Sequence, residues 1–190
     1  MKTSAKISLT ISSLMMIFFL YGCSEKTHEH PVTVLSGKII NPKTKFVVLS
    51  NGAMKFRDTV AVDESGLFKA KLDSFTEGYW SLSHGDEYAD MFLSAGDSVH
   101  MTFNTEQFDE TMNYEGKGAD KNNYLAQSYL LDEQDTTNWY ILAENDFRQK
   151  SDSAKKSSEQ RLKIFLDSFP SVSETFGKYE QAKILYLWAV

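Results

Sequence analysis

Turn sequences divide residues 32–115 into short apolar runs, and this pattern constrains the fold more than any other feature of the chain. The runs are β-branched or alternate between apolar and polar positions, and they recur at intervals of about 8–12 residues, as strands of a sandwich or barrel do. Asn51-Gly52, DESG at 63–66 and AGDS at 95–98 supply turn chemistry. We therefore expect roughly seven or eight strands in an antiparallel β-sandwich or partial barrel.

Two of these turns predict how neighbouring strands connect. Period-two runs flank DESG, which indicates a hairpin in which Gly66 takes the positive φ that the turn requires. AGDS predicts a second tight turn in the same scheme. A parallel sheet is disfavoured, because parallel neighbours need crossover connections that are usually helical, and no helical pattern interrupts residues 32–115.

A helical period replaces the strand pattern in residues 116–190. Gly116-Lys117-Gly118 marks the change, and Asp120 is the predicted N-cap of a first helix. A second helix is expected from about Trp139 to Phe169, where Pro170 ends it. Ser171-Val172-Ser173-Glu174 matches the S-x-x-E capping box and predicts the start of a third helix. The fold class is therefore mainly β with C-terminal helices, with a sandwich domain at 32–115 and a helical segment at 116–190.

The first 22 residues have the pattern of a signal peptide. Lys2 and Lys6 provide a basic start, and the apolar run that follows contains no charge and no proline. The run ends in Leu20-Tyr21-Gly22-Cys23, which resembles the lipobox of bacterial lipoproteins. The resemblance implies that signal peptidase recognises Leu20 and Gly22 and that Cys23 is lipidated. An ordinary signal peptide that happens to contain a cysteine is the alternative.

Lipidation at Cys23 would fix the chain to a membrane of the cell envelope. Stable anchoring needs at least two acyl chains, such as palmitate, and the lipoproteins that the motif resembles have three. Residues 23–31 then form a lipidated tether, and Ser24 after the cysteine favours the outer membrane by analogy with known sorting rules. His28 and His30 in this tether lack further ligands, so we predict no metal site and no cofactor.

Charge and cysteine content exclude two classes of function. The formal net charge of −6 argues against nucleic-acid binding, which needs a basic surface. Because Cys23 is the one cysteine, the chain cannot form an intrachain disulfide or perform dithiol chemistry by itself.

Several polar groupings have a structural explanation that we prefer to a catalytic one. GKGADK at 116–121 lacks the P-loop pattern and predicts a strand-to-helix turn. The acidic pairs Asp86-Glu87 and Asp109-Glu110 could supply the two carboxylates of a glycosidase only if the fold brought a residue of one pair next to a residue of the other, because adjacent residues on a strand face opposite ways. His84 and His100 could assist a nucleophilic serine, but the sequence contains no G-x-S-x-G motif to supply that serine. A final set of aromatic residues is expected to fill the core for the most part, with sugar stacking as the alternative: Tyr79, Trp80, Tyr88, Phe92 and Phe103.

Five stretches share a pattern with a known family. They are DTV at 58–60 with VDESGLFKAKL, GYW at 78–80, FLSAGDSVHMTF, FDETMNYEGKGADKNNYL and FGKYEQAKILYLWAV. Together they resemble the N-terminal domain, of unknown function, of envelope thioredoxin-like lipoproteins, the TlpA-type thiol–disulfide oxidoreductases. The resemblance extends over about residues 32–190, and its most specific part is the aromatic strand followed by Gly-x-Gly and Asn before a helix. Ala95 departs from the proline frequent in the family.

The resemblance implies a family setting without its catalytic half. The family's redox domain contains W-C-x-x-C, whereas Trp80, Trp139 and Trp188 are not followed by cysteine. No catalytic residue is therefore predicted, and oxidoreductase activity would require a downstream redox domain. We also expect the apolar end, ILYLWAV, to pack against the sandwich or, preferably, against protein that follows Val190.

The predicted function is that of a membrane-anchored envelope lipoprotein. It would act as a non-catalytic positioning and docking module for a thioredoxin-like domain or another envelope protein. The alternative is a free-standing β-sandwich module that binds a glycan or a peptide.

Overall fold

The computed structural model describes residues 31–73 and 76–187. The strands are β1 (Thr33–Ile40), β2 (Phe46–Asn51), β3 (Phe56–Ala61), β4 (Leu67–Leu72), β5 (Gly78–His84), β6 (Glu87–Leu93), β7 (Ser98–Asn104) and β8 (Asn113–Lys117). The helices are α2 (Phe108–Thr111), α3 (Ala119–Glu133), the 3-10 helix η2 (Trp139–Ile141), α4 (Glu144–Ser168) and α5 (Glu174–Leu187).

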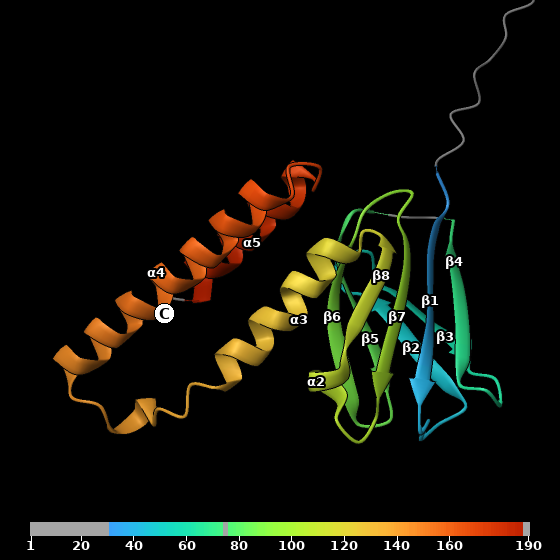
Figure 1. The fold of residues 1–190 in the computed structure, drawn as a ribbon, viewed down its shortest axis with the longest axis horizontal. Coiled ribbons are helices and arrows are strands. Elements are labelled where there is room, and N and C mark those ends of the chain that lie inside the picture. Colours follow the sequence, from blue (N-terminus) through green and yellow to red (C-terminus); the bar gives the residue numbers. More distant parts are fainter. Residues whose placement is uncertain (1–30, 74–75, 188–190) are drawn as a thin grey trace, which may run out of the picture.

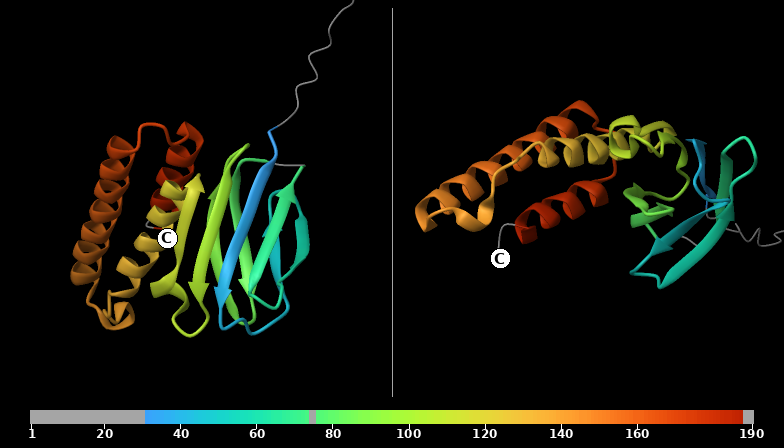
Figure 2. Two further views of the ribbon diagram at one scale, coloured as in Figure 1. Left: turned by 45° about the vertical axis from the view of Figure 1, so that its right-hand side comes forward. Right: turned by 90° about the horizontal axis from the view of Figure 1, so that it is seen from below.

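The strands form two four-stranded sheets that pack as a sandwich. One sheet has the order β4-β1-β7-β8 and the other β3-β2-β5-β6. The three long helices follow in sequence and gather on one side of the sandwich, with α3 next to β6 and β8 (Figure 1 and Figure 2). The expected fold class, an antiparallel β-sandwich or partial barrel followed by helices, is confirmed as a sandwich whose sheets are mostly antiparallel.

The predicted hairpin around DESG is wrong, because its two strands belong to different sheets. β3 pairs with β2, whereas β4 pairs with β1. Gly66 does adopt the expected positive φ, at 79°, and its carbonyl accepts a hydrogen bond of 2.8 Å from the Ile39 amide. AGDS connects β6 and β7, which also lie in different sheets. Turn chemistry fixes the reversal of the chain, but distant partners decide which sheet each strand joins.

One strand pair is parallel, contrary to expectation. β1 and β7 run side by side in parallel register, with Leu35 opposite Val99 and Ile39 opposite Phe103. No helix is needed between them, because the five strands β2–β6 lie between β1 and β7 in the sequence and form the crossover. The rule that parallel pairs need a long connection holds, but strands rather than a helix supply that connection: β4 of the same sheet and the four strands of the second sheet.

Three details of the helical segment differ from the sequence predictions. Gly118, in a left-handed conformation, is the N-cap of α3, and Asp120 lies in the first turn instead. The second helix begins at Glu144, after the separate turn η2. Ser173 rather than Ser171 caps α5, because its Oγ accepts from the Phe176 amide at 3.2 Å. In addition, the loop before β8 contains the one-turn helix α2.

Two apolar clusters hold the structure together. The larger fills the sandwich and includes Leu35, Trp80 and Met101, each no more than 1% exposed. The smaller packs α3, α4 and α5 around Phe92 and Phe176. Phe92 belongs to β6, so the sandwich supplies part of the core of the helices.

Several predicted features lie outside the described residues. They are the signal-peptide residues Leu20 and Gly22, the lipidation site Cys23, the tether histidines, and Trp188 to Val190. Within the described ranges, no helix is both long and apolar enough to cross a bilayer. At the end of α5, Ile184 is buried, whereas Leu185, Tyr186 and Leu187 are exposed.

Candidate functional site

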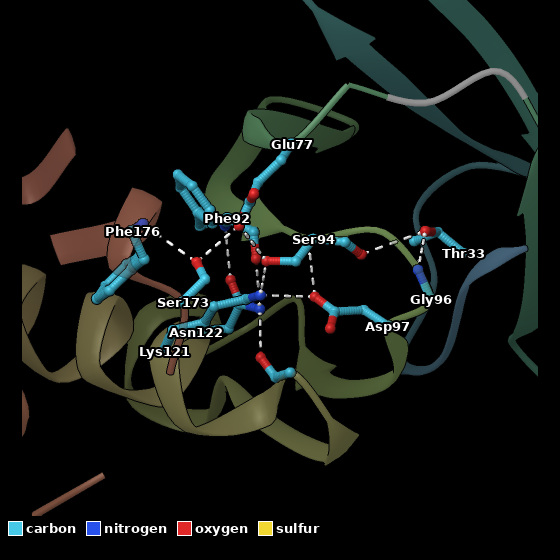
Figure 3. A network of polar contacts seen from close by, with 11 residues as sticks. Thr33, Glu77, Phe92, Ser94, Gly96, Asp97, Lys121, Asn122, Ser173 and Phe176 are labelled. Atoms are coloured by element: carbon cyan, nitrogen blue, oxygen red, sulfur yellow. Dashed lines mark hydrogen bonds and ion pairs between the residues drawn. The ribbon is translucent and has the colours of Figure 1, made fainter. Parts of the chain in front are cut away.

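A buried ion pair joins the sandwich to the helices. Lys121 Nζ of α3 lies 2.6 Å from Asp97 Oδ2 in the β6–β7 turn, and both side chains are only 5% exposed. The same ammonium donates to Ser94 Oγ at 2.6 Å (Figure 3). Asp97 also accepts from the Ser94 amide at 2.8 Å. Because a buried charge is tolerated only when it is paired and hydrogen-bonded, these contacts fix α3 against the turn.

Glu77 extends this network to α5. Its Oε1 accepts hydrogen bonds from Ser94 Oγ at 2.7 Å and from Ser173 Oγ, the cap of α5, at 2.6 Å (Figure 3). Burial alone would raise the pKa of Glu77, but the two hydroxyl donors and the charge of Lys121 outweigh it and lower the pKa below its ordinary value. Glu77 is therefore ionised at neutral pH. It connects the sandwich to α5 through Ser173 and to Lys121 of α3 through Ser94.

Two adjacent asparagines of α3 bind the edge strands of the two sheets. Asn122 accepts from the Phe92 amide of β6 at 2.7 Å and donates to the Phe92 carbonyl at 3.1 Å. Asn123 makes the same pair of bonds to Tyr114 of β8, at 2.9 and 2.8 Å. Both strands are the last in their sheets. The start of α3 therefore covers the open edge of the sandwich and satisfies backbone groups that would otherwise attract another strand.

The glycines of GKGADK permit this close approach. A Cβ on Gly116 would lie 2.3 Å from the Ser98 carbonyl oxygen, and one on Gly118 would lie 2.6 Å from the Asp97 carboxylate. Lys121 forms an ion pair with Asp97, so the stretch is a strand-to-helix turn, as expected.

We call the group formed by Glu77, Ser94, Asp97, Lys121, Asn122, Asn123 and Ser173 the junction. Sequence reasoning missed its pairings, although consecutive polar residues at the start of a packed helix were a usable signal.

A second feature, the tyrosine pocket, lies where α3 meets β5, β6 and β8. It has a volume of about 140 Å³. Its polar lining consists of Tyr79, Tyr88, Asp90, Asp109, Tyr114, Tyr129 and Lys183. The fold therefore separates the predicted aromatic set: Trp80, Phe92 and Phe103 are at most 1% exposed and belong to the core, whereas Tyr79 and Tyr88 reach the pocket.

Carboxylates from the two predicted acidic pairs meet beside this pocket. Burial, followed by the negative charges of Glu133, Glu87 and Glu110, raises the pKa of Asp109 above its ordinary value. Glu87 follows the β5–β6 turn and Asp109 lies in α2, so the fold brings the two pairs near each other. Sequence reasoning missed Asp90, Tyr114 and Tyr129, which join the pocket only through tertiary packing.

The two candidate histidines have structural partners. His84 is buried, and its Nε2 accepts from the Lys43 amide at 3.0 Å. Nδ1 therefore bears the hydrogen and donates to the Phe46 carbonyl at 3.0 Å. His100 Nδ1 lies 3.1 Å from Ser36 Oγ on the neighbouring strand. In the described part of the chain, no three histidine, cysteine or acidic side chains are grouped as metal ligands.

Comparisons with known proteins add little to this geometry. No protein-family model matches the chain, and no curated protein matches it. Among solved structures, the chain is similar to a DUF3823 family protein from Parabacteroides merdae, with 18% sequence identity and a TM-score of 0.28. The match covers 46% of this chain and 47% of that one, so the chain spans about half the length of that protein. Similarity at this level supports no statement about fold or function.

Proposed function

We propose that the chain is a membrane-anchored lipoprotein of the cell envelope that serves as a non-catalytic positioning and docking module. Its partner would be a thioredoxin-like domain or another envelope protein. The observation that carries this proposal is the junction, whose buried ion pair and two asparagines fix α3 across both sheets. Such a rigid connection between the sandwich and α3 suits a module that holds a partner domain in a defined orientation.

The entry of the chain into the sandwich supports this role. The first residues of β1 contact the junction: Thr33 Oγ1 donates to the Ser94 carbonyl at 3.2 Å and accepts from the Gly96 amide at 3.0 Å (Figure 3). A tether that begins at a lipidated Cys23 would therefore reach the sandwich at the same end as the junction. The anchor and the base of the helices would then share one rigid region.

The helices α4 and α5 offer exposed apolar surface for a partner. Among the described residues of α4 and α5, several large apolar side chains are more than a third exposed. They are Phe147, Ile164, Tyr179, Leu185, Tyr186 and Leu187. Exposed apolar side chains concentrated on two neighbouring helices are characteristic of protein–protein contact.

Site-specific photo-cross-linking tests the docking role. A photoreactive residue at Tyr186, which is 76% exposed on α5, should cross-link in cells to a protein with a W-C-x-x-C domain. The matched control is Tyr140, which is fully exposed and belongs to η2 rather than to α4 or α5. Equal cross-linking from both positions, or no cross-linked protein from Tyr186, would contradict the proposal. A captured envelope protein without a redox domain would identify the second kind of partner.

The tyrosine pocket favours a second candidate function, that of a binding module. A broad glycan-stacking face is not supported, because Trp80, Phe92 and Phe103 are buried. What remains is a small pocket with exposed tyrosines at its mouth.

A further inference from the structure

We propose that the tyrosine pocket binds a small organic ammonium group, such as the head of an alkylamine or of a quaternary amine. This inference is separate from the anchoring and docking proposal, because the pocket uses none of the junction contacts. It rests on the size of the pocket, on its aromatic wall and on carboxylates without a cation.

The size of the pocket selects a head group rather than a large ligand. A volume of about 140 Å³ is close to that of an engineered cavity that holds benzene, and it is below the range of drug-sized sites. Ala89, Met112, Leu125 and Ala126 supply apolar surface. The pocket therefore suits a compact group with apolar substituents, which describes a methylated or alkylated amine.

The aromatic wall suits a cation. Tyr79, Tyr88, Tyr114 and Tyr129 line the pocket, and a ring face attracts an ammonium within about 6 Å of its centroid. The hydrogen bond to Glu133 and then burial raise the pKa of Tyr129 to about 12. Burial also raises the pKa values of Tyr79 and Tyr114. These three rings are therefore neutral at physiological pH, and the formal negative charge comes from carboxylates.

The chain already places one ammonium against this wall. Lys183 Nζ of α5 lies 5.5 Å from the centroid of the Tyr79 ring and 3.5 Å from Glu180 Oε1. Among the described residues that line the pocket, Lys183 is the one basic side chain. Its ion-pair partner is Glu180 rather than Asp90 or Asp109, the acidic residues that line the pocket.

The acidic residues of the pocket have no cation of their own. Within the described residues, Asp109 has no side-chain hydrogen bond and no ion pair, while Asp90 accepts only from the Ser81 hydroxyl. Glu87 and Glu133 add further negative charge near Asp109. An anion would be repelled here, and a neutral sugar would leave the carboxylates uncompensated. A bound ammonium would instead satisfy both the carboxylates and the rings.

Choline and its neutral isostere, 3,3-dimethylbutan-1-ol, test the inference because they share a shape and differ in charge. Titration of the full chain, followed by the amide NMR signals of Ala89 and Ala126, should show saturable binding of choline. The neutral alcohol should bind at least about tenfold more weakly, which corresponds to about 1.4 kcal/mol. Absence of choline binding at millimolar concentration, or equal affinity for both probes, would overturn the proposal.

Three variants locate the site. Asp109→Asn preserves side-chain volume and should weaken choline binding by about tenfold, as expected for loss of one partly screened charge contact. The matched control Asp167→Asn, an exposed aspartate of α4 paired with Lys163, should leave the affinity unchanged.

Lys183→Met should strengthen choline binding several-fold, because it removes the resident cation from the pocket. This gain requires a folded protein, so it keeps the test decisive even if Asp109→Asn perturbs folding. Unchanged affinity in both pocket variants would overturn the assignment.

Discussion

Replacement of Lys121 by methionine tests whether the junction holds the helices on the sandwich. Methionine keeps most of the length of the side chain but removes the ammonium that contacts Asp97 and Ser94 at 2.6 Å each. Asp97 would then be a buried carboxylate with only the Ser94 amide as a donor. Breaking a buried pair in this way costs about 3–5 kcal/mol of the free energy of unfolding.

Urea denaturation followed by circular dichroism measures this loss. With a slope of about 2 kcal/mol per molar urea, the midpoint should fall by roughly 1.5–2.5 M. Lys178→Met is the control, since its pair with Glu174 is exposed (side chains 70% and 83%) and should contribute no more than about 1 kcal/mol. Hydrogen exchange should show the largest loss of protection at the start of α3.

A second variant separates charge burial from packing. Asp97→Asn together with Lys121→Met removes both charges, so the double variant should be less destabilised than the two single variants summed, with a coupling energy of about 2–3 kcal/mol. If each single variant costs less than about 1 kcal/mol, or if the two effects simply add, the ion pair does not hold the junction and our reasoning is refuted.

Three further outcomes are expected. Gly66→Ala should lower the free energy of unfolding by about 2 kcal/mol or more, because φ is positive and a Cβ would meet the Ile39 carbonyl oxygen at 2.2 Å, whereas Gly52→Ala, with open space around it, should be nearly neutral in the same urea titration. Cys23→Ser should move the protein from the membrane fraction to the soluble fraction and abolish incorporation of labelled palmitate. Asp109→Asn should raise the melting temperature at pH 7; because folding raises the pKa of this carboxyl, the gain should shrink as pH falls through the folded pKa and vanish below the unfolded value of 3.8.

Local patterns in the sequence were sufficient for the class of fold. Alternation of apolar residues and turn residues such as Gly66 depend on neighbours in the chain, so they predicted short strands, tight turns and the change to helices after Gly118. The same patterns could not predict which strands pair with one another. A turn such as DESG reverses the chain equally well between paired strands and between two sheets, so the predicted hairpin failed while the positive φ was confirmed.

The candidate site shows the same division. The sequence by itself supplied a lipobox-like motif at Cys23, a chain without a second cysteine, and the GKGADKNN stretch as a strand-to-helix turn. Only the tertiary structure showed that Asp97 pairs with Lys121, that Asn122 and Asn123 bind the two edge strands, and that Asp109 lines a pocket together with four tyrosines. The physical reason is distance along the chain: these contacts join residues whose proximity depends on how both sheets and α3 pack together, which no local periodicity encodes.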